Sequence, residues 1–400
     1  MKFITPMLNP LKYVFALLLL ATAGIAAAAA QSDSATVAQD STAADSIAKR
    51  KGFIAKVIDY FASSNRTKKN SKFDVSFIGG PHYSSDTGVG IGLVAAGFYR
   101  NNPRDTISQP SNVSLYSDIA TSGFFLVGLR GDHIFSDDTH RIDYNLYFYS
   151  FPRYFWGIGY DMGNDMDNKS KFRELYVNSS IDYLWRVNQH LFLGPAIEFC
   201  YTDARRRVRP ELWNGQRSHV TTFGVGFRAQ LDTRDNFTAP TRGWLFQLEQ
   251  RFAPRFLGND NYAFSYTDVR SCFYHHAWRD ATVALRLHGR MAYGNVPWNL
   301  MSTFGGSSVM RGYYDGRFRD KGEMDFTVEL RQHIWHRNGI VLWGGVGTVF
   351  PRLSEIQFRR LLPNFGVGYR WEFKKLTNVR IDFGLAKGEH AFIFSINEAF

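Results

Sequence analysis

Polar and apolar side chains alternate with a period of two along most of this chain, from Phe73 to its end. Successive side chains of a β-strand point to opposite faces of the sheet, so the alternation predicts strands with one apolar and one charged face. In segment 322–336 the apolar set is Met324, Phe326, Val328, Leu330 and Ile334, and the set between them is Glu323, Asp325, Thr327, Glu329, Arg331 and His333. Segments 280–294 and 218–232 repeat the pattern. An apolar face toward lipid and a charged face toward a lumen is the arrangement of a transmembrane β-barrel.

Sixteen segments of this kind follow one another along the chain. Their predicted bounds are 73–80, 88–100, 111–120, 123–135, 139–150, 171–186, 190–203, 218–232, 242–253, 261–277, 280–294, 322–336, 339–350, 364–374, 377–387 and 391–400. Most are close to the ~10 residues that a tilted membrane strand needs. We therefore predict an all-β fold, a sixteen-stranded antiparallel transmembrane β-barrel over residues 73–400, because a closed sheet leaves no unpaired edge in lipid. A single strand of a soluble sandwich would alternate in the same way, but the number of segments favours the barrel.

The final segment places Phe392, Phe394 and Ile396 on one face and ends on Phe400. A C-terminal strand that ends on an aromatic residue is typical of bacterial outer-membrane barrels. Phe400 is therefore the predicted C-terminal assembly signal, through which the barrel assembly machinery would insert this chain. The even number of strands predicts that the N-terminal tail and the C-terminus both lie on the periplasmic side.

The N-terminal residues 1–30 have the pattern of a secretory signal peptide. Lys2 and Lys12 precede an apolar run over 13–20, and small residues over 28–30 supply a cleavage site. An uncleaved membrane helix is the alternative, but no stop-transfer flank follows. No later stretch has the roughly 18 apolar residues of a transmembrane helix. Residues 31–72, rich in Ser, Ala, Thr and Asp and then basic, are predicted to form a short periplasmic tail.

The formal net charge of +11 includes a dense cluster of arginines, Arg205, Arg206, Arg207 and Arg209. For an exported chain, outer-membrane lipid headgroups and lipopolysaccharide phosphates are more plausible anionic partners than nucleic acid. Two interpretations of the cluster stay open. It binds lipopolysaccharide phosphates on an outer loop, or it is a solvated run of charge.

Short and long connections alternate between the segments. The long ones, expected outside the cell, are 152–170, 204–217, 295–321 and 351–363. The longest, 295–321, lies between the eleventh and twelfth segments and contains the sequence Val-Met-Arg-Gly-Tyr-Tyr over 309–314.

With this Arg311-Gly312-Tyr313 motif the chain resembles the outer membrane protein 85 superfamily, also called bacterial surface antigen barrels. Other matching positions are Asp232, Arg234, Asp235, Asn236, Pro240 and Gly243 after strand eight, Glu329, Leu330 and Arg331 on strand twelve, and Gly366, Gly368, Arg370, Arg380, Ile381 and Asp382 on strands fourteen and fifteen. The resemblance covers about 73–400 and is strongest in about the last 170 residues. It implies a sixteen-stranded barrel whose longest loop folds back into the lumen.

The resemblance also implies that the loop arginine, Arg311, pairs with carboxylates of the barrel wall. A guanidinium that loses its hydration needs a planar partner, which a carboxylate supplies. Glu329 is the first candidate, and Glu372 and Asp382 are the others. The family usually carries an Asp-x-Gly pattern on strand thirteen, where this chain has Gly-Val-Gly over 345–347, so one expected acceptor is missing.

Barrel-assembly and translocation members of the superfamily, its BamA and TamA branch among them, carry periplasmic polypeptide-transport-associated domains before the barrel. Residues 31–71 are too few for one such domain. The chain therefore resembles a short branch that lacks these domains, and substrate capture by them is not carried over to it.

Three classes of function compete. The resemblance implies outer-membrane protein assembly or translocation of client proteins, with strands one and sixteen meeting at a weak seam that opens sideways. The alternative is a passive pore or structural barrel, in which the basic stripe of Arg286, His288 and Arg290, with Arg370, would favour anions. A hydrolase is disfavoured because no nucleophile and base pair emerges.

No enzyme activity, cofactor or metal site is predicted. The acidic loop 161–168 lacks the spacing of a calcium loop. Gly88, Gly90 and Gly92 lie in a predicted strand without a following helix, so they do not form a phosphate loop. Two cysteines, Cys200 and Cys272, are too few for a disulfide framework, and we expect buried or wall thiols.

Overall fold

A computed structural model of the chain describes residues 73–84, 88–102, 110–259, 262–374 and 377–400. Of residues 73–76, 78, 81–84 and 374 it describes the backbone alone. All described residues belong to one compact unit. The signal peptide and the tail predicted for residues 1–72 lie outside the described residues.

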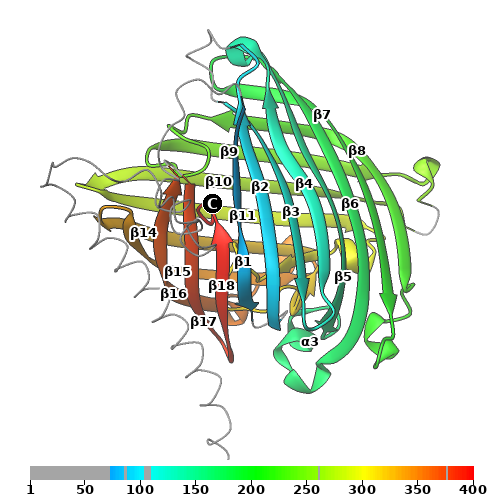
Figure 1. Cartoon of the computed structure of the whole chain (residues 1–400). Helices are drawn as coiled ribbons and strands as arrows, with labels where there is room; N and C mark the ends of the chain where they lie inside the picture. Colours follow the sequence, from blue (N-terminus) through cyan, green and yellow to red (C-terminus); the bar gives the residue numbers. More distant parts are fainter. Residues whose placement is uncertain (1–72, 85–87, 103–109, 260–261, 375–376) are drawn as a thin grey trace, which may run out of the picture. The chain divides into compact units, whose positions relative to one another are not determined.

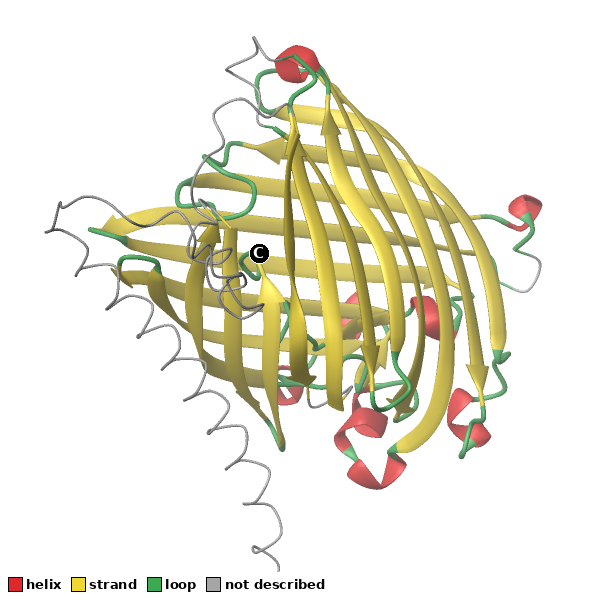
Figure 2. Ribbon diagram, viewed as in Figure 1, coloured by secondary structure: helices red, strands yellow, loops and turns green. Residues whose placement is uncertain are grey.

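One antiparallel sheet of sixteen strands dominates the fold (Figures 1 and 2). Its strands are β1 (Phe73–Ser84), β2 (Gly88–Tyr99), β3 (Ser111–Ala120), β4 (Phe125–Ile134), β5 (His140–Phe155), β6 (Ser170–Arg186), β7 (Leu191–Arg205), β8 (His219–Asp232), β9 (Gly243–Ala253), β10 (Phe264–Trp278), β11 (Ala281–Gly294), β14 (Gly322–Trp335), β15 (Asn338–Phe350), β16 (Leu362–Lys374), β17 (Thr377–Ala386) and β18 (Glu389–Ile396). Each strand pairs with its neighbour in this order. The predicted number of strands and their antiparallel succession are confirmed.

The two faces of the sheet differ as the alternation predicts. On β14, Phe326 is 39% exposed whereas Glu329 is fully buried, and the same contrast separates Leu287 from His288 on β11. We call the face that carries the charged residues the inner face. Because strands of this pattern turn alternate side chains inward, the inner face gathers the charged groups of many strands in one place.

The connections define two ends of the sheet. The long-loop end carries residues 156–169, 206–218, 295–321 and 351–361, which hold the helix α3 (Tyr160–Asn164) and most of the short 3-10 helices (Figure 2). The short-turn end carries connections such as 187–190 and 336–337. No helix in the described part of the chain is long and apolar enough to cross a membrane.

The two end strands of the sheet, β1 and β18, contact each other. Figure 1 shows them side by side where the sheet has curled round. No ladder of strand pairs joins them in the described residues, whereas a ladder joins every other neighbouring pair. Closure of the barrel therefore stays a prediction.

The prediction that the last strand runs to Phe400 is wrong in its last residues. β18 ends at Ile396, and Asn397 has a left-handed backbone conformation with φ of 66°. Asparagine adopts this conformation more readily than most residues, and it breaks the extended strand. Phe400 then packs on a buried cluster of Leu245, Cys272, Tyr274 and Ala284.

Residues 295–321 form an ordered insertion between β11 and β14. It contains a 3-10 turn η5 (Trp298–Leu300) and a two-stranded hairpin of β12 (Ser302–Phe304) and β13 (Phe318–Asp320). Most side chains of the hairpin are buried. The sequence does not predict this hairpin, because strands of three residues are too short to show a pattern of alternation.

An aromatic cluster of Phe155, Phe172, Trp213 and Trp298 lies at the long-loop end. These residues come from the end of β5, the start of β6, the β7–β8 connection and η5. The centroids of the Phe155 and Trp213 rings lie 4.2 Å apart, and those of Trp213 and Trp298 lie 5.9 Å apart. Phe155, Trp213 and Trp298 are fully buried. Apolar burial on this scale holds the insertion against the wall.

Both cysteines are free and buried, Cys200 on β7 and Cys272 on β10. This confirms the prediction of buried or wall thiols.

Candidate functional site

Arg311 lies at the tip of the 295–321 insertion and is 1% exposed. Its Nη1 donates to Asp382 on β17 at 2.7 Å, and its Nη2 contacts Glu329 on β14. Its guanidinium also lies over the ring of Trp343 on β15, 3.8 Å from the ring centroid. The tip of the insertion thus reaches three strands of the inner face through one side chain.

Both carboxylates that hold Arg311 have further arginine partners. Glu329 accepts from Arg331 at 2.9 Å, and Asp382 accepts from Arg370 at 2.6 Å. The C-terminal tail joins the same network, because Glu398 accepts from Arg370 at 2.8 Å. Buried ionic groups of this kind are tolerated only when each has partners, so removing one leaves the others uncompensated. We call this network the clasp.

Backbone geometry explains the small residues around Arg311. Gly312 has φ of 117°, a conformation that side chains other than glycine disfavour. A Cβ atom on Gly384 would lie 2.7 Å from the carbonyl oxygen of Arg311, so the β17 backbone approaches the tip closely. The same carbonyl oxygen accepts from the side-chain amide of Asn364 at 2.8 Å, and the Tyr313 hydroxyl donates to the carbonyl oxygen of Pro363 at 2.9 Å.

The three candidate partners of Arg311 have different positions. Glu329 and Asp382 both contact it, whereas Glu372 lies near the end of β16, where its N–H donates to the carbonyl oxygen of Arg337 at 2.8 Å. Among the described residues, the ion pairs of Arg311 are with the first two. Asp382 thus provides a second acceptor for Arg311. The acceptor expected on strand thirteen is missing, because the chain has Gly-Val-Gly there, over 345–347. The sequence reasoning missed Trp343 and Asn364, although alternation places both on the inner face.

Two residues of the predicted basic stripe, Arg286 and His288, are paired with acids. Arg286 contacts Asp325, and His288 lies 3.1 Å from Asp268 and 3.2 Å from Asp325. The guanidinium of Arg290 lies over the ring of Tyr266, 4.2 Å from its centroid. The stripe therefore presents little uncompensated positive charge to the inner space.

A cavity of about 600 Å³ lies on the inner face, and the C-terminal tail is part of its wall. Polar side chains dominate its lining, and ion pairs such as Arg228 with Asp143 at 2.8 Å cross it from β8 to β5. Among the described residues, no group of three or more His, Cys, Asp and Glu side chains is arranged to hold a metal ion.

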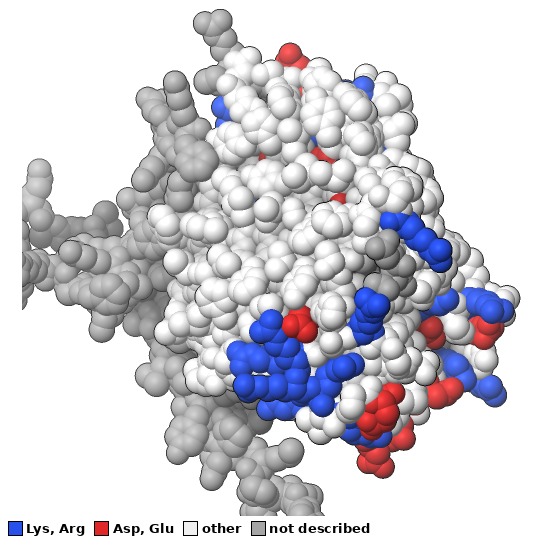
Figure 3. Space-filling view, turned by 90° about the vertical axis from the view of Figure 1, so that its right-hand side faces the viewer, with Lys and Arg blue, Asp and Glu red and all other residues white. Residues whose placement is uncertain are grey.

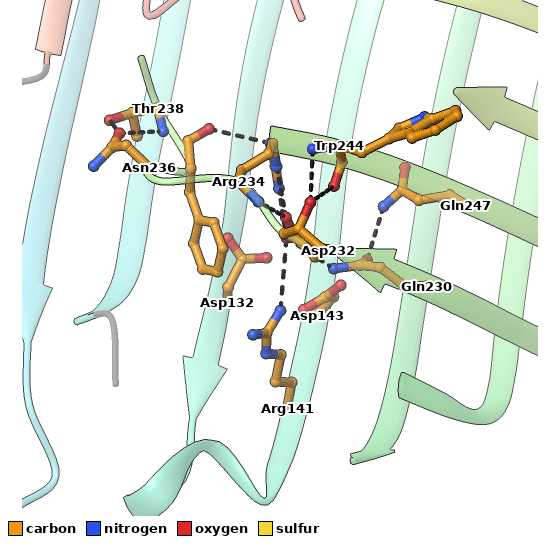
Figure 4. A network of polar contacts seen from close by, with 12 residues as sticks. Asp132, Arg141, Asp143, Gln230, Asp232, Arg234, Asn236, Thr238, Trp244 and Gln247 are labelled. Atoms are coloured by element: carbon orange, nitrogen blue, oxygen red, sulfur yellow. Dashed lines mark hydrogen bonds and ion pairs between the residues drawn. The ribbon is translucent and has the colours of Figure 1, made fainter. Parts of the chain in front are cut away.

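The β8–β9 connection at the short-turn end is held by its own acids (Figure 4). Asp232 accepts from Arg234 Nε and Nη2, each at 2.9 Å, and lies 3.8 Å from Arg141 of β5. Asn236 Oδ1 accepts from the N–H and the hydroxyl of Thr238. The motif residues of this connection thus fix the turn and anchor it to a strand three positions away in the sheet.

Asp235 of the same connection is an acceptor for Thr241. Partial burial opposes ionisation, but the hydrogen bonds from the hydroxyl and N–H of Thr241 and the N–H of Arg242 outweigh it and lower the pKa of Asp235. Gly243 begins β9 with φ of 104°, and a Cβ atom there would lie 2.2 Å from the carbonyl oxygen of Thr233. Glycine is therefore required at this position.

The insertion has further anchors at the long-loop end. Arg153 of β5 donates to Asp315 at 2.8 Å and to Glu174 of β6 at 3.0 Å. Arg317 pairs with Glu389 at the start of β18 at 3.1 Å. These ion pairs attach the insertion to β5 on one side and to the last strand of the sheet, β18, on the other.

Arg319 of the hairpin contacts the carbonyl oxygen of Trp298. Burial desolvates the guanidinium of Arg319 and, with the neighbouring Arg153, lowers its pKa to about 10. It stays protonated at neutral pH and ties the hairpin to the aromatic cluster.

Comparisons with known proteins place this arrangement in a family. Residues 132–400 match the Omp85 superfamily domain. No curated protein sequence matches the chain. Among solved structures, the chain is similar to BamA from Haemophilus ducreyi lacking POTRA domains 1-3, with 13% identity, a TM-score of 0.52, and coverage of 82% of this chain and 71% of that chain.

Two further structures have a similar fold. CdiB from Acinetobacter baumannii has 12% identity and a TM-score of 0.51, and the match covers 82% of this chain and 60% of that chain. CdiB from Escherichia coli has 9% identity and a TM-score of 0.50, with coverage of 86% and 67%. At such identities the likeness concerns the fold alone. Because the superfamily model matches well over half of the chain, the protein belongs to the Omp85 superfamily and is a bacterial outer-membrane protein.

Proposed function

We propose that the protein is a non-enzymatic factor for the assembly or translocation of outer-membrane proteins, in which the β1–β18 seam of a closed sixteen-stranded barrel admits a client strand. The long-loop end faces outward, and the N-terminal tail and the C-terminus lie in the periplasm. The observation that carries the proposal is the seam, where β1 and β18 are in contact but no ladder joins them in the part of the chain that the structure describes.

The lengths of the two seam strands support an opening there. β1 has 12 residues, whereas β18 has 8 and ends at the turn of Asn397. A strand of 8 residues cannot pair with all 12 residues of β1. Unpaired backbone groups are costly in lipid and form a template for an added strand. A client strand that pairs with β1 would satisfy them.

The clasp supports the same mechanism from the other side of the seam. It joins the insertion to β14, β16 and β17 and includes Glu398 of the tail. Strands β1 to β4 contribute no ion pair to it in the described part of the chain. We infer that the C-terminal strands are braced as one wall, so that β1 can separate from β18 while that wall keeps its shape.

The passive anion pore is less well supported. Arg286 and His288 are paired with carboxylates, and Arg370 is held by Asp382 and Glu398. The aromatic cluster packs the insertion against the ends of β5 and β6 and against the β7–β8 connection at the long-loop end. We expect a small, unsteady conductance from such a barrel, and a large, steady one would favour the pore.

Site-specific photocrosslinking in cells tests the seam. Phe77 on β1 is 55% exposed, and Phe227 on β8 is 40% exposed and far from β1 in the sheet order. A photoreactive phenylalanine analogue at 77 is expected to capture newly made outer-membrane proteins, whereas the analogue at 227 captures few. Equal capture at both positions, or none at 77 in a protein that is folded and in the membrane, would contradict the proposal.

A further inference from the structure

Basic side chains gather on the outer face of the sheet at the long-loop end. On β6, Lys171 and Arg173 alternate with the buried Phe172 and Glu174, so both basic residues point outward. On β7, Arg205 follows the buried Ala204 and is exposed. Figure 3 shows Lys and Arg gathered at the lower edge of one side of the molecule, beneath a broad band without charge.

The register brings two of these arginines together. Arg173 is the direct strand partner of Arg205. Side chains directly opposite each other in an antiparallel pair have Cβ atoms ~5 Å apart, and like charges in this position repel. Lys171 follows at ~7 Å along β6, the length of two strand residues. An anion that binds between the two guanidinium groups relieves this repulsion, so the pair favours anion binding.

Few acids compensate this charge. Asp203 accepts from Arg205 at 2.5 Å. The Arg173 guanidinium donates to neutral groups, Ser150 Oγ at 3.2 Å and the carbonyl oxygen of Gly123 at 3.1 Å. Among the described residues, no ion pair involves Lys171 or Arg173. The site therefore carries net positive charge, and the backbone and Ser150 contacts hold Arg173 in place.

The outer face of β6, β7 and the neighbouring β8 is apolar on the side toward the short-turn end. Ile197 on β7 is 53% exposed, Ile181 on β6 is 39% exposed, and Phe223 on β8 is 44% exposed. An apolar band that ends at a basic site is the surface that an acyl-anchored phosphate requires, with its chains on the band and its phosphate on the guanidinium groups.

We propose that Lys171, Arg173 and Arg205 form a binding site for the phosphate groups of lipid A, the membrane anchor of lipopolysaccharide. The proposal rests on the outward orientation of the long-loop end. Guanidinium groups bind phosphate oxygens through paired, charge-assisted hydrogen bonds, and Lys171 adds a point charge for a second phosphate. The site fixes the rotation of the barrel relative to the outer leaflet and lies far in the sheet order from the seam.

Binding of lipid A to the full-length protein in detergent micelles tests the site. The double variant R173Q/R205Q is expected to bind lipid A about tenfold more weakly, because charge-assisted contacts are lost. D203N is expected to bind lipid A more tightly, because it frees Arg205. The matched control R279Q/R352Q removes two exposed arginines elsewhere, whose side chains are 95% and 79% exposed, and should bind as the parent does.

Binding of dephosphorylated lipid A shows whether the protein recognises the phosphate groups or only adsorbs the acyl chains. The parent is expected to bind it as weakly as R173Q/R205Q binds intact lipid A. Unchanged binding in R173Q/R205Q, or equal binding of the dephosphorylated lipid by the parent, would mean that the cluster is a solvated run of charge. Heat-modifiable mobility on gels verifies that each variant is folded, and K171Q gives a second, milder test. Failure of this site would leave crosslinking at position 77 unaffected, so the two proposals fail separately.

Discussion

Replacing Arg311 with alanine is expected to destabilise the protein by about 3–5 kcal/mol, because it leaves the buried carboxylates of Glu329 and Asp382 without their shared partner. Both carboxylates are fully buried, so water cannot replace the guanidinium without opening the site. The cation–π contact with Trp343 is lost as well. Urea unfolding in micelles, followed by tryptophan fluorescence, measures the change, and limited proteolysis of 295–321 reports detachment of the insertion.

A double-mutant cycle isolates the pair within the clasp. E329A alone removes one acceptor of Arg311 and one of the partners of Arg331. The combined variant R311A/E329A is expected to cost less than the sum of the two single changes, since each removes the same ion pair. R352A, which loses a largely exposed pair with Glu355, should change the free energy of unfolding by less than about 1 kcal/mol. Additive costs, or a cost of R311A equal to that of R352A, would show that Arg311 does not hold the insertion.

Replacing Trp298 with alanine is expected to cost about 3–5 kcal/mol of local stability and to raise the conductance of the barrel. Trp298 is fully buried, and its indole N–H donates to the carbonyl oxygen of Arg217 at 3.1 Å. Its backbone N–H donates to Gln216 at 2.6 Å, so the residue joins the insertion to the β7–β8 connection. Its removal leaves a cavity at the centre of the aromatic cluster and loosens the only aromatic contacts that η5 makes in the described residues.

Single-channel recordings in planar bilayers measure the conductance. W298A is expected to show more frequent and larger openings than the parent. W335A is the matched control, because Trp335 is 58% exposed near the short-turn end and lies outside the cluster. Identical recordings from the parent and W298A would mean that the aromatic cluster does not close the long-loop end.

Alternation predicted the sheet because strand period and burial are local properties of the sequence. All sixteen strands fall near their predicted bounds, and the inner position of Glu329 follows from its neighbours Val328 and Leu330. The resemblance limits the candidate partners of Arg311 to three carboxylates. The sequence does not decide between Asp382 and Glu372, because that choice depends on where the tip of the insertion lies. That position is set by contacts between residues that are distant in sequence.

The features that the sequence did not predict share this cause. The aromatic cluster joins Phe155 at the end of β5, Trp213 of the β7–β8 connection and Trp298 of the insertion, and these residues have no common spacing in the sequence. The alternation of polar and apolar residues does not predict the turn at Asn397, because it continues past the residue at which the strand ends. The pairing of Arg173 with Arg205 needs the register of β6 and β7, which alternation leaves open by any even shift.

We propose that this barrel serves other outer-membrane proteins. Depletion of the protein in its own bacterium, followed by quantitative mass spectrometry of purified outer membranes, tests this role. We expect at least one β-barrel or surface protein to disappear from the outer membrane within a few generations, and to return when the parent gene is restored. An unchanged inventory of outer-membrane proteins after complete depletion would contradict the account.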